Sequence, residues 1–129
     1  MDILIVDDSV VLRKILERSL RQTQIAIGSV LEAGDGREAL EKLRTHAVQI
    51  VFSDMNMPHM DGLELLRQIK ATPSLQHVPV VIVTTDGSES TVLQALALGA
   101  AAYIRRPFTT LQMEAALAGV LAQSDPVKE

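Results

Sequence analysis

The sequence predicts an α/β fold, a doubly wound five-stranded parallel sheet with helices on both faces. Five short apolar runs are separated by longer segments whose apolar residues recur every three or four positions. The runs are apolar throughout instead of alternating with polar residues, which is typical of strands covered on both faces. Regular alternation of strand and helix makes a parallel sheet with right-handed crossovers. At 129 residues, the chain is long enough for one domain with its own core.

Each predicted strand is a short apolar run, at residues 3–6, 30–31, 48–52, 78–83 and 103–104. The second run is the weakest of the five. The first run is followed by two acids, the third by Asp54, the fourth by Thr84 and the fifth by a basic pair. Because the carboxyl ends of parallel strands lie on one edge of the sheet, we expect these polar residues to share that edge.

Each predicted helix is a stripe of apolar residues at helical spacing, over 11–20, 39–47, 63–70, 92–97 and 111–121. Asp8 or Ser9 is placed to cap the first helix. Pro73 ends the third helix, and Gly99 follows the fourth as a C-terminal cap.

The composition excludes several classes of function. The formal net charge is −4 and only 2% of the residues are aromatic, which argues against a nucleic-acid partner. The absence of cysteine excludes disulfides, thiolate catalysis and iron–sulfur clusters. No apolar stretch reaches the roughly 18 residues that a membrane span needs. We therefore expect a cytoplasmic protein without a membrane partner.

Three carboxylates follow the first and third predicted strands. Asp7 and Asp8 come directly after the first strand, and Asp54 follows the third. Each acid alone is explained as a helix cap or a turn residue. If the two strands are neighbours, the carboxylates converge and their mutual repulsion calls for a cation. Mg²⁺ fits best, because it takes one or two carboxylates with waters and phosphate, whereas zinc and iron favour His and Cys clusters that are missing here.

A hydroxyl and a guanidinium stand at the two remaining strand ends. Each of them alone, Thr84 or Arg106, is an ordinary strand-end residue. Around a carboxylate and a metal, however, these groups would stabilise the charge of a transferring phosphoryl group. Asp54 is the best candidate nucleophile, because a carboxylate accepts a phosphoryl group as an acyl phosphate.

Five segments of the sequence form one recognisable set. They are IVDDS at 5–9, DGREAL at 35–40, DMNMP at 54–58 with DG at 61–62, PVVIVT at 79–84 and GAAAYIRRPF at 99–108. Taken together and in this order, they resemble the receiver domain of two-component response regulators, in particular the single-domain chemotaxis regulators. The resemblance implies the flavodoxin-like strand order 2-1-3-4-5. It also implies a receiver domain over residues 1–123, followed by a short C-terminal tail at 124–129.

The resemblance implies a phosphoryl-transfer role for the acidic residues. Asp54 would accept the phosphoryl group from a histidine kinase or a phosphotransfer protein. Mg²⁺ would be held by Asp7, Asp8, Asp54 and the backbone carbonyl of Asn56, with Asp7 acting mainly through water. The chain would then be no enzyme beyond its own phosphorylation and autodephosphorylation.

The resemblance also implies a switch and a control of hydrolysis. Thr84 would move toward the phosphoryl group, and Tyr103 would turn inward behind it. Asn56 and Asp86 lie two residues beyond Asp54 and Thr84, where the family tunes the access of hydrolytic water.

Arg106 departs from the family pattern, which usually has lysine at this position. A guanidinium is planar and bidentate, so the exchange is not conservative. Either Arg106 contacts the phosphoryl oxygens as lysine would, or it clamps Asp54 in the resting state and weakens coupling to the signalling face. The alternative function is therefore a receiver-fold binding module whose switch is altered or independent of phosphorylation.

The helices predicted at 88–98 and 110–123 carry one acid each and many alanines. Such low charge indicates either an exposed apolar face or tight packing of small residues. In the resembled family, the fourth helix, fifth strand and fifth helix bind a downstream protein, and a homodimer through the two helices is a further expectation. A phosphohydrolase is disfavoured because Asn56 stands where it needs a second acid. A flavin protein is disfavoured because no Ser/Thr-rich loop follows the first strand.

Overall fold

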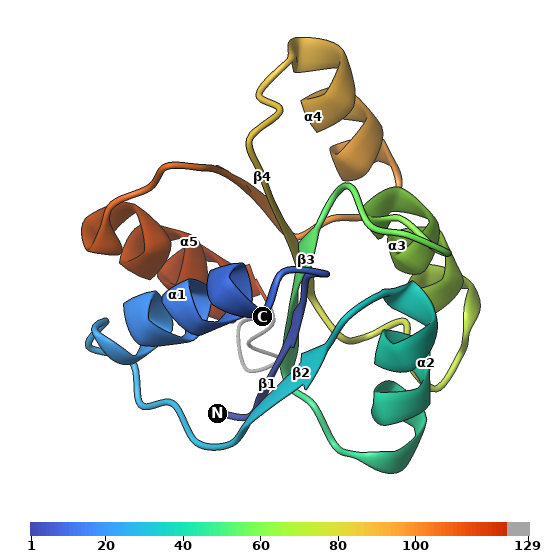
Figure 1. The fold of residues 1–129 in the computed structure, drawn as a ribbon, viewed down its shortest axis with the longest axis horizontal. Helices are drawn as coiled ribbons and strands as arrows, with labels where there is room; N and C mark the ends of the chain where they lie inside the picture. The colour runs from blue at the N-terminus through green and yellow to red at the C-terminus, as the bar shows by residue number, and fades with distance from the viewer. Residues whose placement is uncertain (124–129) are drawn as a thin grey trace.

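A computed structural model describes residues 1–123, which form one parallel sheet flanked by helices (Figure 1). The elements are, in chain order, β1 (Ile3–Val6), α1 (Val10–Arg21), β2 (Val30–Ala33), α2 (Gly36–Thr45), β3 (Ile50–Asp54), α3 (Gly62–Ala71), β4 (Val80–Thr84), α4 (Glu89–Ala97), β5 (Ala102–Arg105) and α5 (Thr110–Gln123). The strand order is β2-β1-β3-β4-β5. The predicted fold class and strand order are confirmed. The tail expected at 124–129 lies outside the described residues.

The sheet is buried because its strands present apolar side chains to both faces. Every residue of β1 and β4 is buried. One face packs against α2 and α3, with Leu66 and Ile69 among the buried side chains. The other face packs against α1 and α5, with Leu20 and Leu117 (Figure 1). Burial on both faces explains why these strand sequences do not alternate between apolar and polar residues.

Four helices begin at a capping side chain. Ser9, Asp35, Asp61 and Ser88 each accept a hydrogen bond from the backbone N–H three residues further on. A cap of this kind is worth about 1 kcal/mol. Of the two caps expected for α1, Ser9 takes this place, and Asp8 is left exposed. The caps fix the loops that join each strand end to the next helix, which is where the candidate residues lie.

Several strand boundaries differ from those expected. β2 continues to Ala33, which is buried and pairs with Val6. β3 and β4 begin two residues later than expected, at Ile50 and Val80, and include the polar residue at their ends. Pro79 explains the start of β4, because proline has no N–H to donate to a neighbouring strand.

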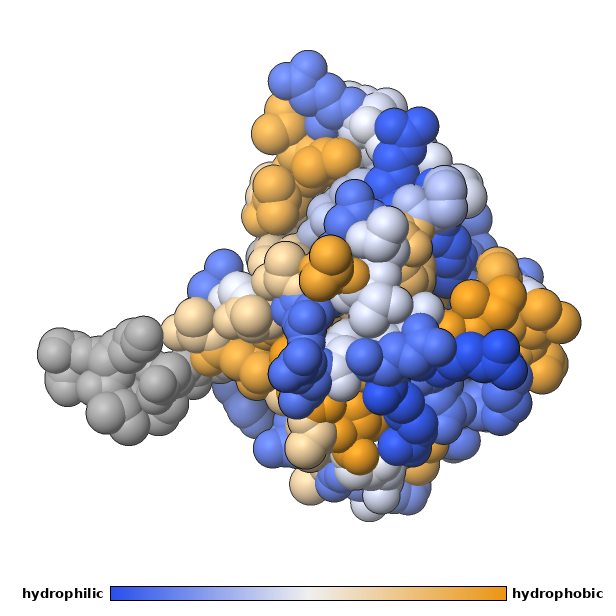
Figure 2. All heavy atoms as spheres, turned by 90° about the vertical axis from the view of Figure 1, so that its left-hand side faces the viewer, coloured by the Kyte–Doolittle hydropathy of each residue, from blue (hydrophilic) through white to orange (hydrophobic). Residues whose placement is uncertain are grey.

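α4 is lightly packed on the rest of the fold. Ala95 is its buried residue, whereas Leu93 and Leu96 are 57% and 47% exposed. α4 stands at the top of the molecule in Figure 1, and Figure 2 shows apolar residues along one side of the same region. The low-charge segment therefore does expose apolar surface. None of the helices within residues 1–123 is long and apolar enough to cross a membrane.

Candidate functional site

Three carboxylates meet at the edge of the sheet where β1 and β3 end. Asp7 and Asp8 directly follow β1, and Asp54 is the last residue of β3. The two strands are neighbours, with Val6 paired with Ser53. Each acid offers one oxygen, and these oxygens all lie within 4.8 Å of one another. The structure thus brings together the three acids that the sequence analysis selected.

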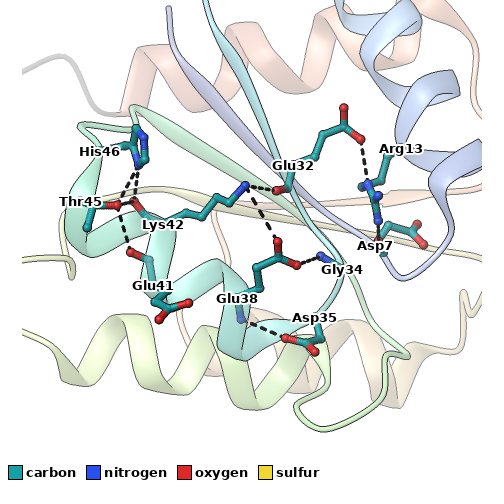
Figure 3. A network of polar contacts seen from close by, with 10 residues as sticks. All are labelled: Asp7, Arg13, Glu32, Gly34, Asp35, Glu38, Glu41, Lys42, Thr45 and His46. Carbon is teal, nitrogen blue, oxygen red and sulfur yellow. Dashed lines mark hydrogen bonds and ion pairs between the residues drawn. The ribbon is translucent and has the colours of Figure 1, made fainter.

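Asp7 is buried and has a hydrogen-bond partner at every polar atom. Its Oδ1 accepts from the backbone N–H of Ser9 and its Oδ2 from Nη2 of Arg106, both at 2.9 Å. Its own N–H donates to the carbonyl oxygen of Ala33 at 3.0 Å. Its carbonyl oxygen accepts from Nη1 of Arg13 at 2.6 Å (Figure 3). A buried carboxylate needs such partners, and together they hold Asp7 in one position.

Asp54 is largely buried beside the two other acids, with its side chain 13% exposed. Burial raises the pKa of its carboxyl group, and the negative charges of Asp7 and Asp8 raise it as well. Arg106 acts in the opposite direction, with its Nη1 3.7 Å from Oδ1 of Asp54. One guanidinium therefore compensates the repulsion only in part, and a further cation would favour the ionised form of Asp54.

The donor set suits a hard divalent cation. Within residues 1–123, the cluster consists of carboxylates alone, without a histidine or cysteine ligand. Mg²⁺ takes its ligands from one or two carboxylates and keeps several waters. Asp8, which is exposed, and Asp54 are the carboxylates best placed to bind it, because both oxygens of Asp7 are already engaged. Asn56, whose carbonyl is the further expected ligand, lies exposed in the loop after β3.

Arg106 lies inside the acidic pocket and is largely buried. It approaches Asp7 at 2.9 Å and Asp54 at 3.7 Å. The clamp that the sequence analysis considered for Asp54 is therefore found mainly on Asp7. The physical reason is that Asp7 is the more deeply buried acid and has more to gain from a cationic partner. A planar fork with two terminal nitrogens lets one arginine face both acids.

The predicted switch residues lie on the two strands beyond β3. Thr84 ends β4 and is buried, and its hydroxyl accepts the N–H of Asp86 at 3.2 Å. Tyr103 lies on β5 and packs against the core on the side of α2 and α3. Its hydroxyl is buried without a hydrogen-bond partner among residues 1–123, and burial raises its pKa. An unpartnered buried hydroxyl is costly, so Tyr103 would gain from a second position.

Asp86 is tied to the start of α4. Its carboxylate accepts from the N–H of Ser88 at 3.0 Å and from the hydroxyl of Thr91 at 3.1 Å. These bonds, with that of Ser88 first, hold the pKa of Asp86 below its ordinary value. The sequence pattern gave no sign of this contact between Asp86 and the helix. The predicted effects of Asp86 and Asn56 on hydrolytic water stay predictions.

Arg13 is a neighbour of the site that the sequence analysis missed. It lies on α1, where its Nη1 contacts the carbonyl oxygen of Asp7 and its Nε donates to Glu32 at 2.8 Å (Figure 3). The sequence did contain one sign of this contact, a basic residue one helical turn beyond the capping Ser9. The first turn of a helix that directly follows a strand lies close to the end of that strand.

The fold and the acidic pocket together define a signalling domain of a known class. The sequence model of the response regulator receiver domain matches residues 3–118, and the chain belongs to this family. Receiver domains are signalling proteins that bind Mg²⁺ at an acidic pocket. The resemblance seen in the sequence is confirmed.

Relatives of the chain include regulators of chemotaxis. The chain is 36% identical over 126 residues to chemotaxis protein CheY1 of Helicobacter pylori, covering 97% of this chain and 100% of that protein. It is 38% identical over 122 residues to a chemotaxis protein CheY homolog of Campylobacter jejuni, covering 94% and 92% of the two chains. The structure of Vibrio cholerae chemotaxis protein CheY4 is similar with a TM-score of 0.81 and 29% identity, over 92% of this chain and 97% of that chain.

Proposed function

We propose that the protein is a phosphoacceptor switch of a two-component pathway, which takes a phosphoryl group on Asp54 from a histidine kinase or phosphotransfer protein in the cytoplasm. The observation that carries the proposal is the cluster of Asp7, Asp8 and Asp54, whose oxygens lie within 4.8 Å of one another. Arg106 on the same cluster adds the positive charge that a phosphoryl group requires.

The transfer step follows from the position of Asp54. An oxygen of its carboxylate attacks the phosphorus atom of a phosphohistidine, and the electron pair of the broken P–N bond leaves with the imidazole. Nη1 of Arg106, 3.7 Å from Oδ1 of Asp54, is placed to stabilise the phosphoryl oxygens, and Thr84 offers a hydroxyl donor at the next strand end. When bound, Mg²⁺ supplies further positive charge to these oxygens. Attack by water on the acyl phosphate releases phosphate and restores Asp54.

The signalling surface in this proposal is formed by α4, β5 and α5. Tyr103 lies on β5, which contacts both α4 and α5, and Leu93 and Leu96 of α4 are exposed. Movement of Thr84 toward a phosphoryl group would change the space available to Tyr103, and so the surface offered to a downstream protein. A homodimer would use the same apolar residues.

An apolar hollow that borders Arg106 offers a docking place for the phosphodonor protein. A hollow of about 350 Å³ lies between α1 and the loop after β5, lined by Leu12, Ile15, Pro107 and Phe108. Arg106 borders the hollow and also contacts the acidic pocket. Apolar side chains of a partner could pack there while its phosphohistidine reaches the pocket.

Incubation with a small-molecule phosphodonor and Mg²⁺, followed by intact-mass measurement, tests the proposal. We expect the protein to gain one phosphoryl group, and the Asp54→Asn variant to gain none. Removal of Mg²⁺ by a chelator should stop the reaction. Glu41→Gln, which changes an exposed acid of α2, is the matched control and should react like the unaltered protein. A folded protein that gains no phosphoryl group would contradict the proposal.

An altered-switch binding module is the second candidate, favoured by the 2.9 Å contact between Arg106 and Asp7. Because this contact holds one nitrogen of the guanidinium on Asp7, it would restrain movement of Arg106 toward a phosphoryl group. The Arg106→Lys variant is expected to be phosphorylated and to show a larger change in the amide exchange of α4 on phosphorylation. Equal responses of the two proteins would sink the second candidate.

A further inference from the structure

We propose that Arg13 is a positioning residue that holds the peptide unit between Asp7 and Asp8, so that both acids face the bound cation. The inference rests on the proposed function. Arg13 is only 15% exposed, and its two contacts differ in kind. Its Nε meets the carboxylate of Glu32, whereas its Nη1 meets a backbone carbonyl in the turn that carries the acids.

The contacted carbonyl belongs to the peptide unit that joins the two acids. This unit is planar, so its orientation sets the directions in which the residues on either side leave it. The N–H of Asp7 is fixed by Ala33, and the side chain of Asp7 by Ser9 and Arg106. The carbonyl oxygen is the remaining polar atom of Asp7, and Arg13 holds it at 2.6 Å.

Asp8 depends on this peptide unit more than Asp7 does. Its side chain is exposed, so packing does not fix the direction of its carboxylate. If the carbonyl of Asp7 were released, the peptide unit could rotate and carry the backbone of Asp8 with it. A charge-assisted bond from a largely buried arginine is strong enough to oppose that rotation. Arg13 therefore preorganises the carboxylate that is most open to a cation.

Glu32 of β2 keeps the guanidinium of Arg13 in its place. Its carboxylate accepts from Nε of Arg13 at 2.8 Å and from Nζ of Lys14 at 2.7 Å, and these cations, Lys14 first, lower its pKa. Its backbone carbonyl accepts from Lys42 at 2.8 Å (Figure 3). Lys14 thus shares Glu32 with Arg13. Unlike Arg13, however, Lys14 contacts Glu32 without reaching the carbonyl oxygen of Asp7, and its side chain is 63% exposed.

The direction in which Mg²⁺ affinity changes when Arg13 is removed distinguishes a positioning role from a purely electrostatic one. Arg13 is a positive charge close to an acidic cluster, so Coulomb repulsion alone predicts that removing it would strengthen the binding of Mg²⁺. Loss of positioning predicts the opposite, because the acids would have to be ordered when the cation binds. Lys14 carries the same charge on the same glutamate without touching Asp7, which makes it the matched control.

The experiment is a calorimetric titration of Mg²⁺ into the unphosphorylated protein and into Arg13→Met, Arg13→Lys and Lys14→Met variants at one ionic strength. We expect Arg13→Met to weaken binding about tenfold, the lower end of what loss of a ligand-orienting residue usually costs. Lys14→Met should bind as tightly as the unaltered protein or more tightly. Arg13→Lys keeps the positive charge but not the planar guanidinium, so its Mg²⁺ affinity should lie between those of Arg13→Met and the unaltered protein. The backbone amide resonance of Asp8 should shift in Arg13→Met and not in Lys14→Met.

Each outcome has a definite reading. Binding by Arg13→Met that equals or exceeds that of the unaltered protein would overturn the inference. A purely structural role would lower stability in urea and leave the Mg²⁺ affinity of the folded protein unchanged, which would overturn it too. If Arg13→Met does not fold, weaker binding by Arg13→Lys supports the inference and equal binding overturns it. Failure of the unaltered protein to bind Mg²⁺ would instead refute the proposed function.

Discussion

At the scale of single residues, the surroundings of Asp54 disfavour the ionised form of its carboxyl group. Burial and the neighbouring acids raise its pKa above the ordinary 3.8, so the folded protein holds this proton at a pH where the unfolded chain has released it. Stability therefore falls as pH rises through the folded-state pKa.

Asp54→Asn should remove this penalty. Without Mg²⁺, we expect the variant to have a higher free energy of unfolding than the unaltered protein near neutral pH. The difference should shrink as pH falls toward 3.8, the ordinary pKa of aspartate, because the carboxyl group is then protonated in the folded and the unfolded chain alike. Urea unfolding in a chelator at several pH values measures this. An advantage of the variant that grows toward acid pH would contradict the sign.

The residue types at the site follow from the sequence, but their partners do not. Asp7 and Asp8 are adjacent and chemically identical. Their positions after β1 alone determine that Asp7 is buried and Asp8 is exposed. The sequence indicated that Arg106 belongs to the site. That Arg106 lies closer to Asp7 than to Asp54 depends on how deeply each acid is buried, which the sequence does not show. Arg13 was missed because its contact requires α1 and β2 to be placed in space.

At the scale of elements, the start of α3 lies directly against the strand end that carries Asp54. A Cβ atom on Gly62 would overlap the carbonyl oxygen of Asp54. Gly62→Ala should therefore lower the free energy of unfolding by about 2–3 kcal/mol. Gly119→Ala in α5 is the control, because its Cβ would meet nothing within 4 Å, and it should raise stability by up to about 1 kcal/mol. Urea unfolding compares the two, and equal effects would refute the clash.

Asp86 sets the stability of the first turn of α4. Asp86→Ala removes acceptors for Ser88 and Thr91, so we expect the amides of Glu89–Ala97 to exchange several-fold faster with deuterium. Ser90→Ala, at an exposed position on the same turn, is the control. Unchanged exchange in α4 would show that the carboxylate does not hold the helix.

Apolar runs predicted the strands and the starts of β1 and β2, but not the starts of β3 and β4. Val48 and Val78 are buried although they precede β3 and β4. Hydrophobic pattern reports burial, whereas a strand is defined by hydrogen bonds to its neighbour, and the two criteria separate at the ends of a strand. The apolar stripes likewise began three residues after the starts of α2 and α4, because a capped first turn need not contain an apolar side chain.

At the scale of the whole molecule, binding of Mg²⁺ should raise the free energy of unfolding. A ligand that binds only the folded state adds about 2.7 kcal/mol at a concentration one hundred times its dissociation constant. We expect MgCl₂ to raise the thermal unfolding temperature relative to NaCl of equal ionic strength. Asp8→Asn should remove most of the increase, because Asp8 is the exposed carboxylate of the cluster. An equal increase in this variant would place the cation elsewhere.

The strand order also has a consequence for synthesis on the ribosome. Since β1 lies between β2 and β3, the first 54 residues already contain three adjacent strands and all three acids of the pocket. Arg106 follows β5 at the far edge of the sheet and leaves the ribosome last of the charged groups there. A nascent chain folding from its N-terminus therefore holds uncompensated negative charge until Arg106 has been synthesised. Arrival of the final strand completes the sheet and brings the arginine that compensates part of this charge.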